Sequence, residues 1–448
     1  MLNLDYFHKK DNLKLTESNK IKTHSKDKKM KSKKFVVDLF AGCGGLSLGL
    51  EKAGFHPVFA NELNKNVMAS YLMNRQIIEP RLSSPDFHEY DIKNIVTKKG
   101  AIKKIADSIN KEFKISVENG DLDLLVGGPP CQGFSGIGHR RSYSVDKEQL
   151  PSNHLYQDMA WVVNKLKPKI FMFENVKGLL SAKWTPTGTK GEIFEDVLHS
   201  FNSIKGYRVS HALVLAKDYG APQNRPRILV VGVRDDVDTT AWEKIDSKVA
   251  NGFLPKPTYD APDLIDLLGD LVDSNFEYGG STDRYLEKAT NKYQKLLRTG
   301  IDGKVAPKGA VLTEQDYSNH SEKVIEKFAY MLKNNGAIPP HLKTKKFAQR
   351  LLPVRWGEGG PSITATSLPD DYVHFSQARV PTVREWARLQ GFPDWYQFAG
   401  SRTTGGLRRA GNPQEGNFDR ELPKYTQIGN AVPVYLAEQV GLHFSKVL

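Results

Sequence analysis

One of the two cysteines of this 448-residue chain stands in a setting suited to nucleophilic chemistry. Cys131 lies in the sequence Gly-Gly-Pro-Pro-Cys-Gln-Gly-Phe-Ser (127–135), directly after the apolar run 121–126. Such a run predicts a central parallel strand, and open α/β sheets place their chemistry at the carboxyl ends of these strands. A thiolate is a strong nucleophile even as a minor fraction of the thiol. We therefore interpret Cys131 as a nucleophile, although an isolated cysteine is more often a small buried apolar residue.

An acid and two arginines accompany later apolar runs. Glu174 comes directly after the run 169–173, which predicts an acid at the same edge of the sheet as Cys131, where it can donate a proton. A helix cap or a surface acid is the alternative interpretation. Arg225 and Arg227 lie one residue apart in a segment that we expect to be extended, so their side chains could project the same way. They could hold a substrate oxygen, or simply pair with surface acids.

A glycine-rich turn near the start of the chain predicts a nucleoside site. The predicted strand 35–40 runs into Ala-Gly-Cys-Gly-Gly (41–45) and then into a helix from about Leu46. Glycines allow the main chain to approach a ligand closely. The next predicted strand, 56–60, ends in Asn61 and Glu62, where dinucleotide-binding folds place an acid for ribose hydroxyls. Packing of a helix on a strand is the other explanation of the glycines, and no Gly-Lys-Ser/Thr follows, which disfavours a triphosphate P-loop.

Composition limits the class of protein. The chain is 39% hydrophobic and 26% charged, lacks an apolar run of membrane-spanning length, and begins with charged residues rather than an apolar signal, so we expect a cytoplasmic protein. Two cysteines cannot form a disulfide framework or a Cys-rich zinc site, and no metal is predicted. The net charge of +13 fits a nucleic-acid partner. Part of it lies in a Lys-rich tail, residues 1–34, which is either disordered, a phosphate-binding arm, or an artefact of start-codon choice with Met30 as the true start.

The remaining segments divide the chain. Helices are predicted near 102–111 and at 155–166, and strands at 169–173, 207–215 and 227–233. Residues 236–378 lack this alternation and carry scattered aromatic and basic residues; they form either a small domain whose loops read a groove or an irregular lid. Helical character is predicted at 382–390, stopped by Gly391 and Pro393. The segment 427–433 leads into an apolar helix that could return to the first domain.

These stretches, in this order, resemble the C5-cytosine DNA methyltransferase family of the restriction-modification type. The family's Phe-x-Gly-x-Gly-Gly is matched by Phe40, Gly42, Gly44 and Gly45; its Pro-Cys-Gln by 130–132; its Glu-Asn-Val by 174–176; and its Gln-x-Arg-x-Arg by 223–227. Its Arg-Glu-x-Ala-Arg-Leu-Gln is matched by 384–390 and its Gly-Asn-Ala-Val-Pro by 429–433. The resemblance covers nearly the whole chain from Phe35, except 236–378.

The resemblance implies an α/β fold, namely the Rossmann-like mixed sheet of S-adenosylmethionine-dependent methyltransferases with helices on both faces, plus a smaller irregular domain. The implied domains are the tail (1–34), a catalytic and cofactor-binding domain (35–235), a target recognition domain (236–378), a connecting region (379–426) and a returning segment (427–448). The implied cofactor is S-adenosylmethionine. It is expected at a set of residues from both ends of the chain: Phe40, Gly42, Gly44, Gly45, Asn61, Glu62, Asp91, Ile92, Pro130, Leu155, Asn430 and Ala431.

The implied reaction is methylation of cytosine carbon 5 within a short sequence of duplex DNA, after the base is flipped out of the helix. Cys131 would add to carbon 6, Glu174 would protonate ring nitrogen 3, and Arg227, with Arg225 behind it, would hold the base's oxygen. The other cysteine, Cys43, is expected to be a spectator. The candidate DNA contacts are Gln132, Ser135, Arg284, Arg350 and Arg355.

The resemblance also suggests partners and rivals. A restriction endonuclease with the same recognition site is a possible functional partner, and the protein is expected to be a monomer that acts on DNA in the bacterial cytosol. One rival is a cytosine-5 methyltransferase of transfer RNA, but a Cys-Phe-Thr stretch common in that branch is absent, since no cysteine follows Cys131. The other rival is an inactive DNA-binding regulator, against which the intact Pro-Cys-Gln and Glu-Asn-Val argue.

Overall fold

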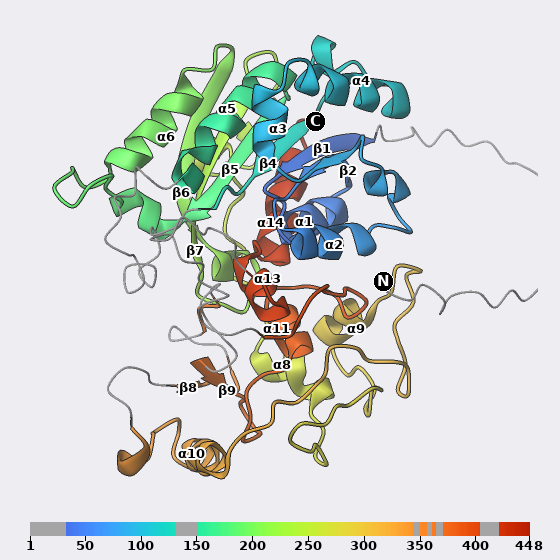
Figure 1. The fold of residues 1–448 in the computed structure, drawn as a ribbon, viewed down its shortest axis with the longest axis vertical. Helices are drawn as coiled ribbons and strands as arrows, with labels where there is room; N and C mark the ends of the chain where they lie inside the picture. The colour runs from blue at the N-terminus through green and yellow to red at the C-terminus, as the bar shows by residue number, and fades with distance from the viewer. Residues whose placement is uncertain (1–32, 131–150, 344–348, 356–360, 364–370, 404–420) are drawn as a thin grey trace, which may run out of the picture. The chain divides into compact units, whose positions relative to one another are not determined.

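A seven-stranded mixed sheet forms the centre of the fold in the computed structural model, which describes residues 33–130, 151–343, 349–355, 361–363, 371–403 and 421–448 (Figure 1). The strands β1 to β5 pair in parallel, β7 runs antiparallel to its neighbours β5 and β6, and the order is β3-β2-β1-β4-β5-β7-β6. This confirms the predicted α/β class with a mixed sheet. The strands are β1 (Lys34–Leu39), β2 (Phe55–Asn61), β3 (His88–Glu89), β4 (Leu124–Gly127), β5 (Ile170–Val176), β6 (Tyr207–Leu215) and β7 (Pro226–Arg234).

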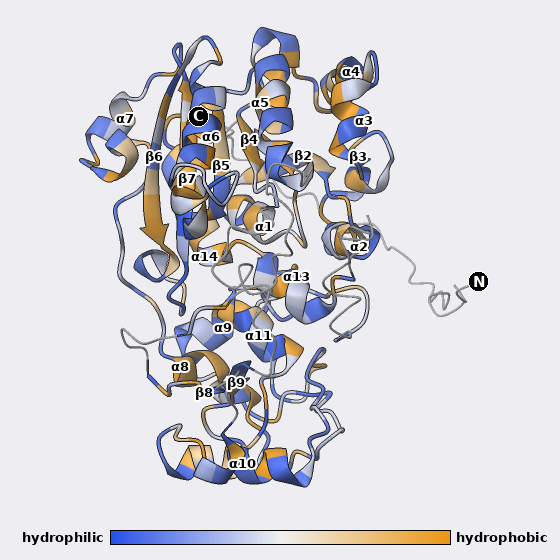
Figure 2. Cartoon of the chain, turned by 60° about the vertical axis from the view of Figure 1, so that its left-hand side comes forward, coloured by the Kyte–Doolittle hydropathy of each residue, from blue (hydrophilic) through white to orange (hydrophobic). Residues whose placement is uncertain are grey.

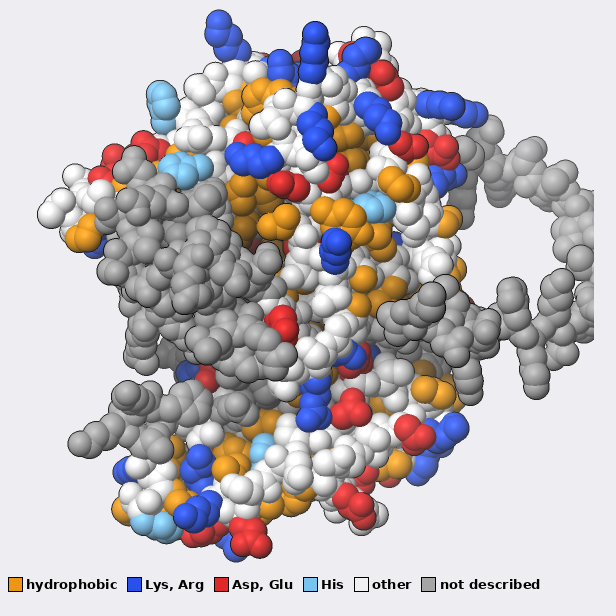
Figure 3. Space-filling model, in the orientation of Figure 1, with side chains coloured by type: hydrophobic (Ala, Val, Ile, Leu, Met, Phe, Trp, Pro, Cys, Tyr) orange, Lys and Arg blue, Asp and Glu red, His pale blue; other side chains and the backbone are white. Residues whose placement is uncertain are grey.

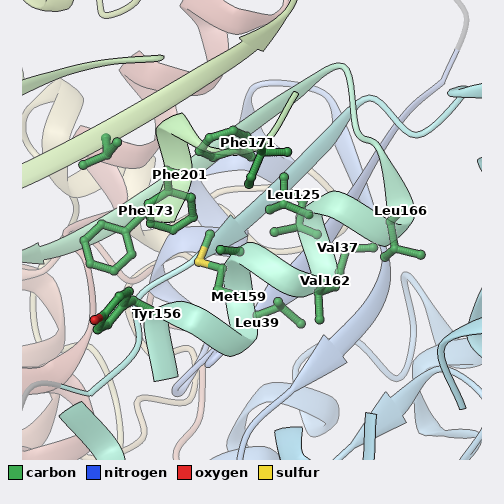
Figure 4. Packing of buried hydrophobic residues seen from close by; sticks show 14 of the residues in the cluster. Val37, Leu39, Leu125, Tyr156, Met159, Val162, Leu166, Phe171, Phe173 and Phe201 are labelled. Atoms are coloured by element: carbon green, nitrogen blue, oxygen red, sulfur yellow. The ribbon is translucent and has the colours of Figure 1, made fainter. Parts of the chain in front are cut away.

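Helices cover both faces of the sheet because alternate residues of each central strand are buried on opposite sides. Val37, Leu125 and Phe171 belong to the cluster on one face, where they pack beneath α3 (Ile92–Thr97), α4 (Ala101–Phe113), α5 (Leu155–Leu166) and α6 (Glu192–Asn202). Figure 4 shows Met159 of α5 among these strand residues. Their neighbours in sequence belong to the cluster on the other face, against α1 (Gly45–Lys52) and α14 (Val434–Phe444). Both faces of the sheet are therefore core, which explains the apolar runs of the sequence.

The helix α14 returns to the beginning of the chain, as the sequence predicts. Leu436 and Val440 of α14 share a buried cluster with Leu46 and Leu50 of α1. The two helices approach closely at Gly49, where a Cβ atom would collide with Ala437 and with the main chain of α14. The layer that contains α1 is thus completed by the last helix.

The predicted elements match the observed ones closely, with one informative difference. The predicted bounds of α5 and β6 agree with the structure, and α1 begins one residue before Leu46. β5 extends beyond the predicted 169–173, because Glu174, Asn175 and Val176 continue to pair with β7. Glu174 consequently lies within the strand rather than after it.

Short elements replace the alternation of strand and helix after Arg234. Trp242 of α7 (Thr240–Glu243) stacks on His443 of α14, with ring centroids 4.8 Å apart, so the first part of this region packs on the sheet side. The predicted domain boundary at residue 236 stays a prediction. In α10, Phe328 and Met331 are buried while other residues face outward, and Figure 2 shows apolar and polar residues mixed along this helix. The other elements are α8 (Leu264–Leu268), α9 (Lys292–Arg298), α10 (Glu322–Lys333), β8 (Arg350–Leu351), β9 (Tyr372–Val373), α11 (Val383–Leu389), α13 (Lys424–Asn430) and α2 (Lys65–Met73) in the first half.

The helix α11 is buried along its whole length although it carries three charges. Its first turn is held by a capping box, in which Thr382 and Glu385 each bind the other's main-chain N–H. Arg388 binds Asp270 at 2.5 Å and Asp394 at 2.6 Å. Buried guanidinium groups of this kind are retained only when carboxylates or carbonyls satisfy them, so α11 fixes the segments around it.

Among the residues that the structure describes, no helix is long and apolar enough to cross a bilayer.

Candidate active site

The edge formed by the carboxyl ends of the parallel strands gathers the predicted site residues. The last residue of β1, Leu39, pairs with Asn61 of β2 and with Gly127 of β4. On the other side of β4, Val176 at the end of β5 pairs with Arg227 at the start of the antiparallel β7. The strand order reverses between β1 and β4, which is where open α/β sheets bind their ligands.

Glu174 and Arg227 form an ion pair at this edge. Arg227 Nε lies 2.5 Å from Glu174 Oε1, and both side chains are about nine-tenths buried. The other carboxylate oxygen lies beside the loop after β4, since a Cβ atom on Gly128 would come within 2.9 Å of Glu174 Oε2. The absence of a side chain at Gly128 therefore leaves room for this carboxylate three residues before Cys131.

The loop after β4 is held by a residue that the sequence analysis did not select. Asn175 is buried, and its Nδ2 donates to the carbonyl oxygen of Pro129 at 3.2 Å. Its Oδ1 accepts from the N–H of Val176 at 2.8 Å. Its place in the Glu-Asn-Val motif at 174–176 was the available sequence signal. Cys131, Gln132 and Ser135 lie outside the described residues.

Arg225 has different partners from Arg227, although both are buried. Its guanidinium donates to main-chain carbonyls of Ile363, Gly429 (2.7 Å) and Ala431 (3.1 Å). The chain turns just before β7, where the N–H of Arg225 donates to the carbonyl of Gln223 at 3.1 Å, so the two arginines do not share one regular strand. Arg225 thereby holds the turn that carries Asn430 and Ala431.

Two glutamines from separate motifs extend this connection. Gln223 Nε2 donates to Gln390 Oε1 at 2.9 Å, and Gln390 Nε2 donates to the carbonyl of Ile428 at 2.8 Å. Both glutamines are buried. The segments 223–225, 389–390 and 428–431 are therefore joined by buried hydrogen bonds, which sequence spacing alone does not predict.

The glycine-rich turn after β1 adopts a conformation that favours glycine. Gly42 and Gly44 have φ angles of 57° and 90°, and Phe40 also has a positive φ of 56°. Gly45 lies against the main chain of Val432, so a side chain there would collide. Within the part of the chain that the structure describes, space remains open beside Gly42, where a Cβ atom would meet nothing within 4 Å.

Glu62 closes one side of this turn. Its Oε2 accepts from the N–H of Gly42 at 3.1 Å, and its Oε1 accepts from the N–H of Asn64 at 2.9 Å. Desolvation raises the pKa of Glu62, and these two N–H groups oppose that effect. A carboxylate oxygen accepts more than one hydrogen bond, so Glu62 retains capacity for ligand hydroxyls.

The other predicted cofactor residues fall into two groups. Asn61, Asp91 and Ile92 support the main chain: Asn61 Nδ2 donates to the carbonyls of Glu89 and Tyr90 at 2.9 Å each, Asp91 caps α3 through the N–H of Lys93, and Ile92 belongs to the core. The second group lies nearer the surface or at the returning turn: Pro130 and Asn430 are exposed, Leu155 is half-buried and Ala431 is buried.

Cys43 is unsuited to nucleophilic chemistry. It is 1% exposed, and its Sγ donates to the carbonyl of Gln427 at 3.4 Å. Burial raises the pKa of the Cys43 thiol to about 12, so it stays protonated at neutral pH. Its setting agrees with the predicted spectator role.

The three described arginines proposed as DNA contacts are exposed, and Arg284 lies far in sequence from the neighbouring Arg350 and Arg355. Arg284 donates to the carbonyl of Gly309 at 3.0 Å, and the Arg350 guanidinium lies 4.5 Å from the ring centroid of Tyr372. Basic residues are not confined to this region, since Figure 3 shows Lys and Arg side chains over the surface around α4 as well. Two lysines there are paired, Lys103 with Asp107 and Lys104 with Asp86.

The turn and its surroundings fit S-adenosylmethionine, the cofactor that the sequence predicts. Glu62 supplies an acceptor for ribose hydroxyls, and the glycine main chain leaves open space beside it. No cluster of His, Cys, Asp and Glu suited to a metal ion occurs in the described ranges.

Comparisons with known proteins agree with this geometry. The family model described as C-5 cytosine-specific DNA methylase matches residues 35–446. The Type II methyltransferase M.DdeI of Desulfomicrobium norvegicum is 28% identical over 431 residues, covering 92% of this chain and 88% of the relative. M.PspPI of a Psychrobacter species is 30% identical over 424 residues, covering 92% and 79%. A solved structure titled as a DNA modification methyltransferase from an E. coli prophage has a TM-score of 0.61 at 23% identity, covers 92% of this chain and 99% of that one, and shows the same fold.

The family match spans nearly all of the chain from β1 to α14, and it includes the glycine turn, the Glu174–Arg227 pair and the returning segment. The chain therefore belongs to the C-5 cytosine-specific DNA methylase family.

Proposed function

We propose that this DNA cytosine-5 methyltransferase modifies one cytosine within a short specific sequence of duplex DNA, through a flipped base and a covalent Cys131 adduct. The observation that carries this proposal is the buried Glu174–Arg227 pair beside Gly128, three residues before Cys131. An acid, a cation and a thiol at one sheet edge are the groups that activation of a cytosine ring requires. S-adenosylmethionine is the methyl donor of this enzyme family, and it supplies an electrophilic methyl group.

The nucleophilic step belongs to Cys131. Its thiolate forms a bond to carbon 6, and the electron pair of the 5,6 double bond moves toward carbon 5. Carbon 5 would then form a bond to the methyl group that S-adenosylmethionine supplies, while the bond from that methyl group to sulfur breaks and S-adenosylhomocysteine is left. Removal of the carbon 5 proton by a base, in our proposal a water molecule, restores the double bond and expels the thiolate. Each bond that Cys131 forms is thus broken again, and the enzyme is regenerated.

Glu174 and Arg227 control the charge on the ring. We assign protonation of ring nitrogen 3 to Glu174, which keeps negative charge from building up as Cys131 adds. In the same proposal the proton returns to Glu174 when the double bond is restored and Cys131 leaves. The position of Glu174 Oε2 near Gly128 supports this role, because the oxygen faces the loop that leads to Cys131. Arg227 is placed to hold both the carboxylate and the oxygen of the base. Arg225 acts less directly, through the turn at 429–431.

The region 236–378 is our proposed target recognition domain. Its exposed arginines Arg284, Arg350 and Arg355 are candidates for guanine contacts, since a guanidinium can bind both major-groove acceptors of guanine. Contacts to phosphates would contribute the free energy needed to flip the base, about a few kcal/mol. The link from Ile363 through Arg225 to the turn at 429–431 connects the end of this region to the catalytic side.

A role in restriction-modification follows from the named relatives. M.DdeI and M.PspPI are both named Type II methyltransferases. We propose that methylation by this enzyme protects host DNA from an endonuclease with the same recognition site. Exposure of methylated and unmethylated host DNA to extracts of the source cells tests this: cleavage of only the unmethylated DNA is expected, and equal cleavage of both contradicts it.

The decisive experiment measures transfer of labelled methyl groups to duplex DNA and, in parallel, to total transfer RNA. Label on DNA, mapped by bisulfite sequencing to one short motif, is the expected result. Label only on RNA would replace the proposed substrate. Label on neither would indicate a binding protein without activity.

A trapping experiment tests the covalent step. Duplex DNA with 5-fluorocytosine at the mapped position should form a denaturation-resistant complex with the wild type, because fluorine cannot leave as a proton does. Cys131→Ala should form none, and Cys43→Ala serves as the matched control that retains both trapping and transfer. If Cys43→Ala is inactive and Cys131→Ala is active, the assignment of the nucleophile is wrong.

A further inference from the structure

Two side chains hold the carbonyl groups of the glycine turn. The turn follows β1, and its open side lies at Gly42. Tyr396 Oη donates to the carbonyl of Cys43 at 2.5 Å, and Arg75 Nη2 donates to the carbonyl of Gly44 at 3.3 Å. Neither residue belongs to the motifs that identify the family in the sequence.

The two side chains are themselves fixed. Arg75 Nε and Nη2 bind the two carboxylate oxygens of Glu51 at 2.7 and 2.9 Å, and its guanidinium lies 3.8 Å from the ring centroid of Tyr71. Arg75 Nη1 also donates to Tyr396 Oη at 3.1 Å, which joins the two groups. A bidentate, stacked and buried guanidinium has little freedom to move.

The segment that carries Tyr396 is anchored far from the turn in sequence. Tyr396 is fully buried and packs against Phe392, with ring centroids 4.8 Å apart. Its main-chain carbonyl accepts from Arg384 of α11 at 2.9 Å. The hydroxyl therefore reaches the turn from a rigid support rather than from a mobile loop.

The fit around the turn is tight. A Cβ atom on Gly44 would come within 2.7 Å of both Arg75 Nη1 and Tyr396 Oη. The glycine at this position is thus required by the two side chains next to it as well as by its φ of 90°. The N–H of Gly42 is bound by Glu62, so each side of the turn has a dedicated partner.

We propose that Arg75 and Tyr396 are positioning residues that preorganise the turn for S-adenosylmethionine. They act by binding main-chain carbonyls, so that the open side stays in the shape that binds the cofactor. If the turn adopts its binding conformation in only a fraction of the molecules, the apparent Kd for the ligand rises as that fraction falls. This inference rests on the proposed assignment of the turn as the cofactor site.

The test compares two tyrosine-to-phenylalanine variants of the full chain. Tyr396→Phe removes only the hydroxyl that binds Cys43. Tyr207→Phe is a matched control, because the Tyr207 hydroxyl also donates to a main-chain carbonyl, that of Pro168, at 2.5 Å, but in a part of the sheet remote from the turn. Calorimetric titration with S-adenosylhomocysteine, the demethylated form of the cofactor, gives the Kd of each protein, and thermal unfolding without ligand gives its stability.

We expect Tyr396→Phe to raise the Kd about fivefold, the size of one net hydrogen bond, while Tyr207→Phe changes it less than about twofold. At saturating cofactor, Tyr396→Phe should keep its kcat and show the loss only in the KM for S-adenosylmethionine. Arg75→Lys, which cannot bind Glu51 and Gly44 together, should weaken binding in the same way and serves as the second variant should Tyr396→Phe fail to fold.

The possible results distinguish failure of the positioning role from failure of the cofactor-site assignment. Equal Kd values for wild type and Tyr396→Phe overturn the positioning role, and so does an equal loss in Tyr396→Phe and Tyr207→Phe, which would indicate general destabilisation. If the wild type itself does not bind S-adenosylhomocysteine, the assignment of the cofactor site is wrong. A selective loss in Tyr396→Phe and Arg75→Lys supports the positioning role.

Discussion

Asp38 provides a prediction that can be worked out from its surroundings. It lies near the end of β1, is 1% exposed, and its Oδ2 accepts from Ser47 Oγ at 2.5 Å, whereas its Oδ1 has no hydrogen-bond partner among the described residues. Desolvation raises the pKa of Asp38 from 3.8 to about 7; the hydrogen bond from Ser47 and the charge of Arg75 oppose this, and the charges of Glu51 and Glu62 add to it. Replacement by Asn removes the titration and keeps the shape.

The direction in which stability changes with pH follows from proton linkage. The folded state binds the proton of Asp38 more tightly than the unfolded state does, so the stability is undiminished below pH 3.8 and falls as the pH rises toward 7. A shift of this size corresponds to a loss of about 4 kcal/mol, complete above pH 7, of which about 3 kcal/mol develops between pH 5 and pH 8. Asp38→Asn should lack this loss.

Urea unfolding of wild type and Asp38→Asn at pH 5 and pH 8 measures the effect. At each pH, the free energy of unfolding of Asp38→Asn is subtracted from that of the wild type, and the two differences are compared. The comparison is needed because the amide that replaces the carboxyl group also changes the free energy of unfolding, by an amount that does not depend on pH. A difference between wild type and Asp38→Asn that is the same at pH 5 and pH 8 would refute the reasoning.

Three further predictions concern the site and its support. Arg227→Met should lower the single-turnover methylation rate at least about 100-fold, since it removes the cation beside Glu174; a rate near wild type would contradict the role of the pair. Thr382→Ala should lower the free energy of unfolding by about 1–2 kcal/mol in urea titration through loss of the capping box, and no change would mean that the cap is not needed. DNA affinity should fall steeply between about 50 and 200 mM salt, and a flat salt profile would exclude binding dominated by phosphates.

The sheet and its helices could be predicted from the sequence because both faces of the central strands are buried. The runs around Val37, Val126 and Phe171 are apolar without alternation, which is typical of parallel strands covered on both sides. Glycines and polar residues follow these strands at their carboxyl ends. The order of the motifs therefore predicts that the site residues lie along one edge of the sheet. The same pattern also predicts the return of α14.

The partners of polar side chains could not be predicted in this way. Arg225, Gln223 and Gln390 bind main-chain carbonyls or one another across more than 100 residues of sequence, and no periodicity encodes such contacts. The roles of Arg75 and Tyr396 could not be predicted either, because an arginine in the turn after α2 and a tyrosine after Pro393 have many possible partners. The region 236–378 is built from short elements whose order follows no simple alternation, so its bounds stay a prediction.

The packing of α14 against α1 has a consequence for the order of events during synthesis. Leu436 and Val440 cover the same apolar cluster as Leu46, which is made nearly 400 residues earlier. A ribosome must therefore release the α14 segment before that side of the sheet can close, and until then the nascent enzyme leaves an apolar surface for chaperones to shield. Competence to methylate should thus arise only after translation has passed residue 444, rather than growing gradually with chain length.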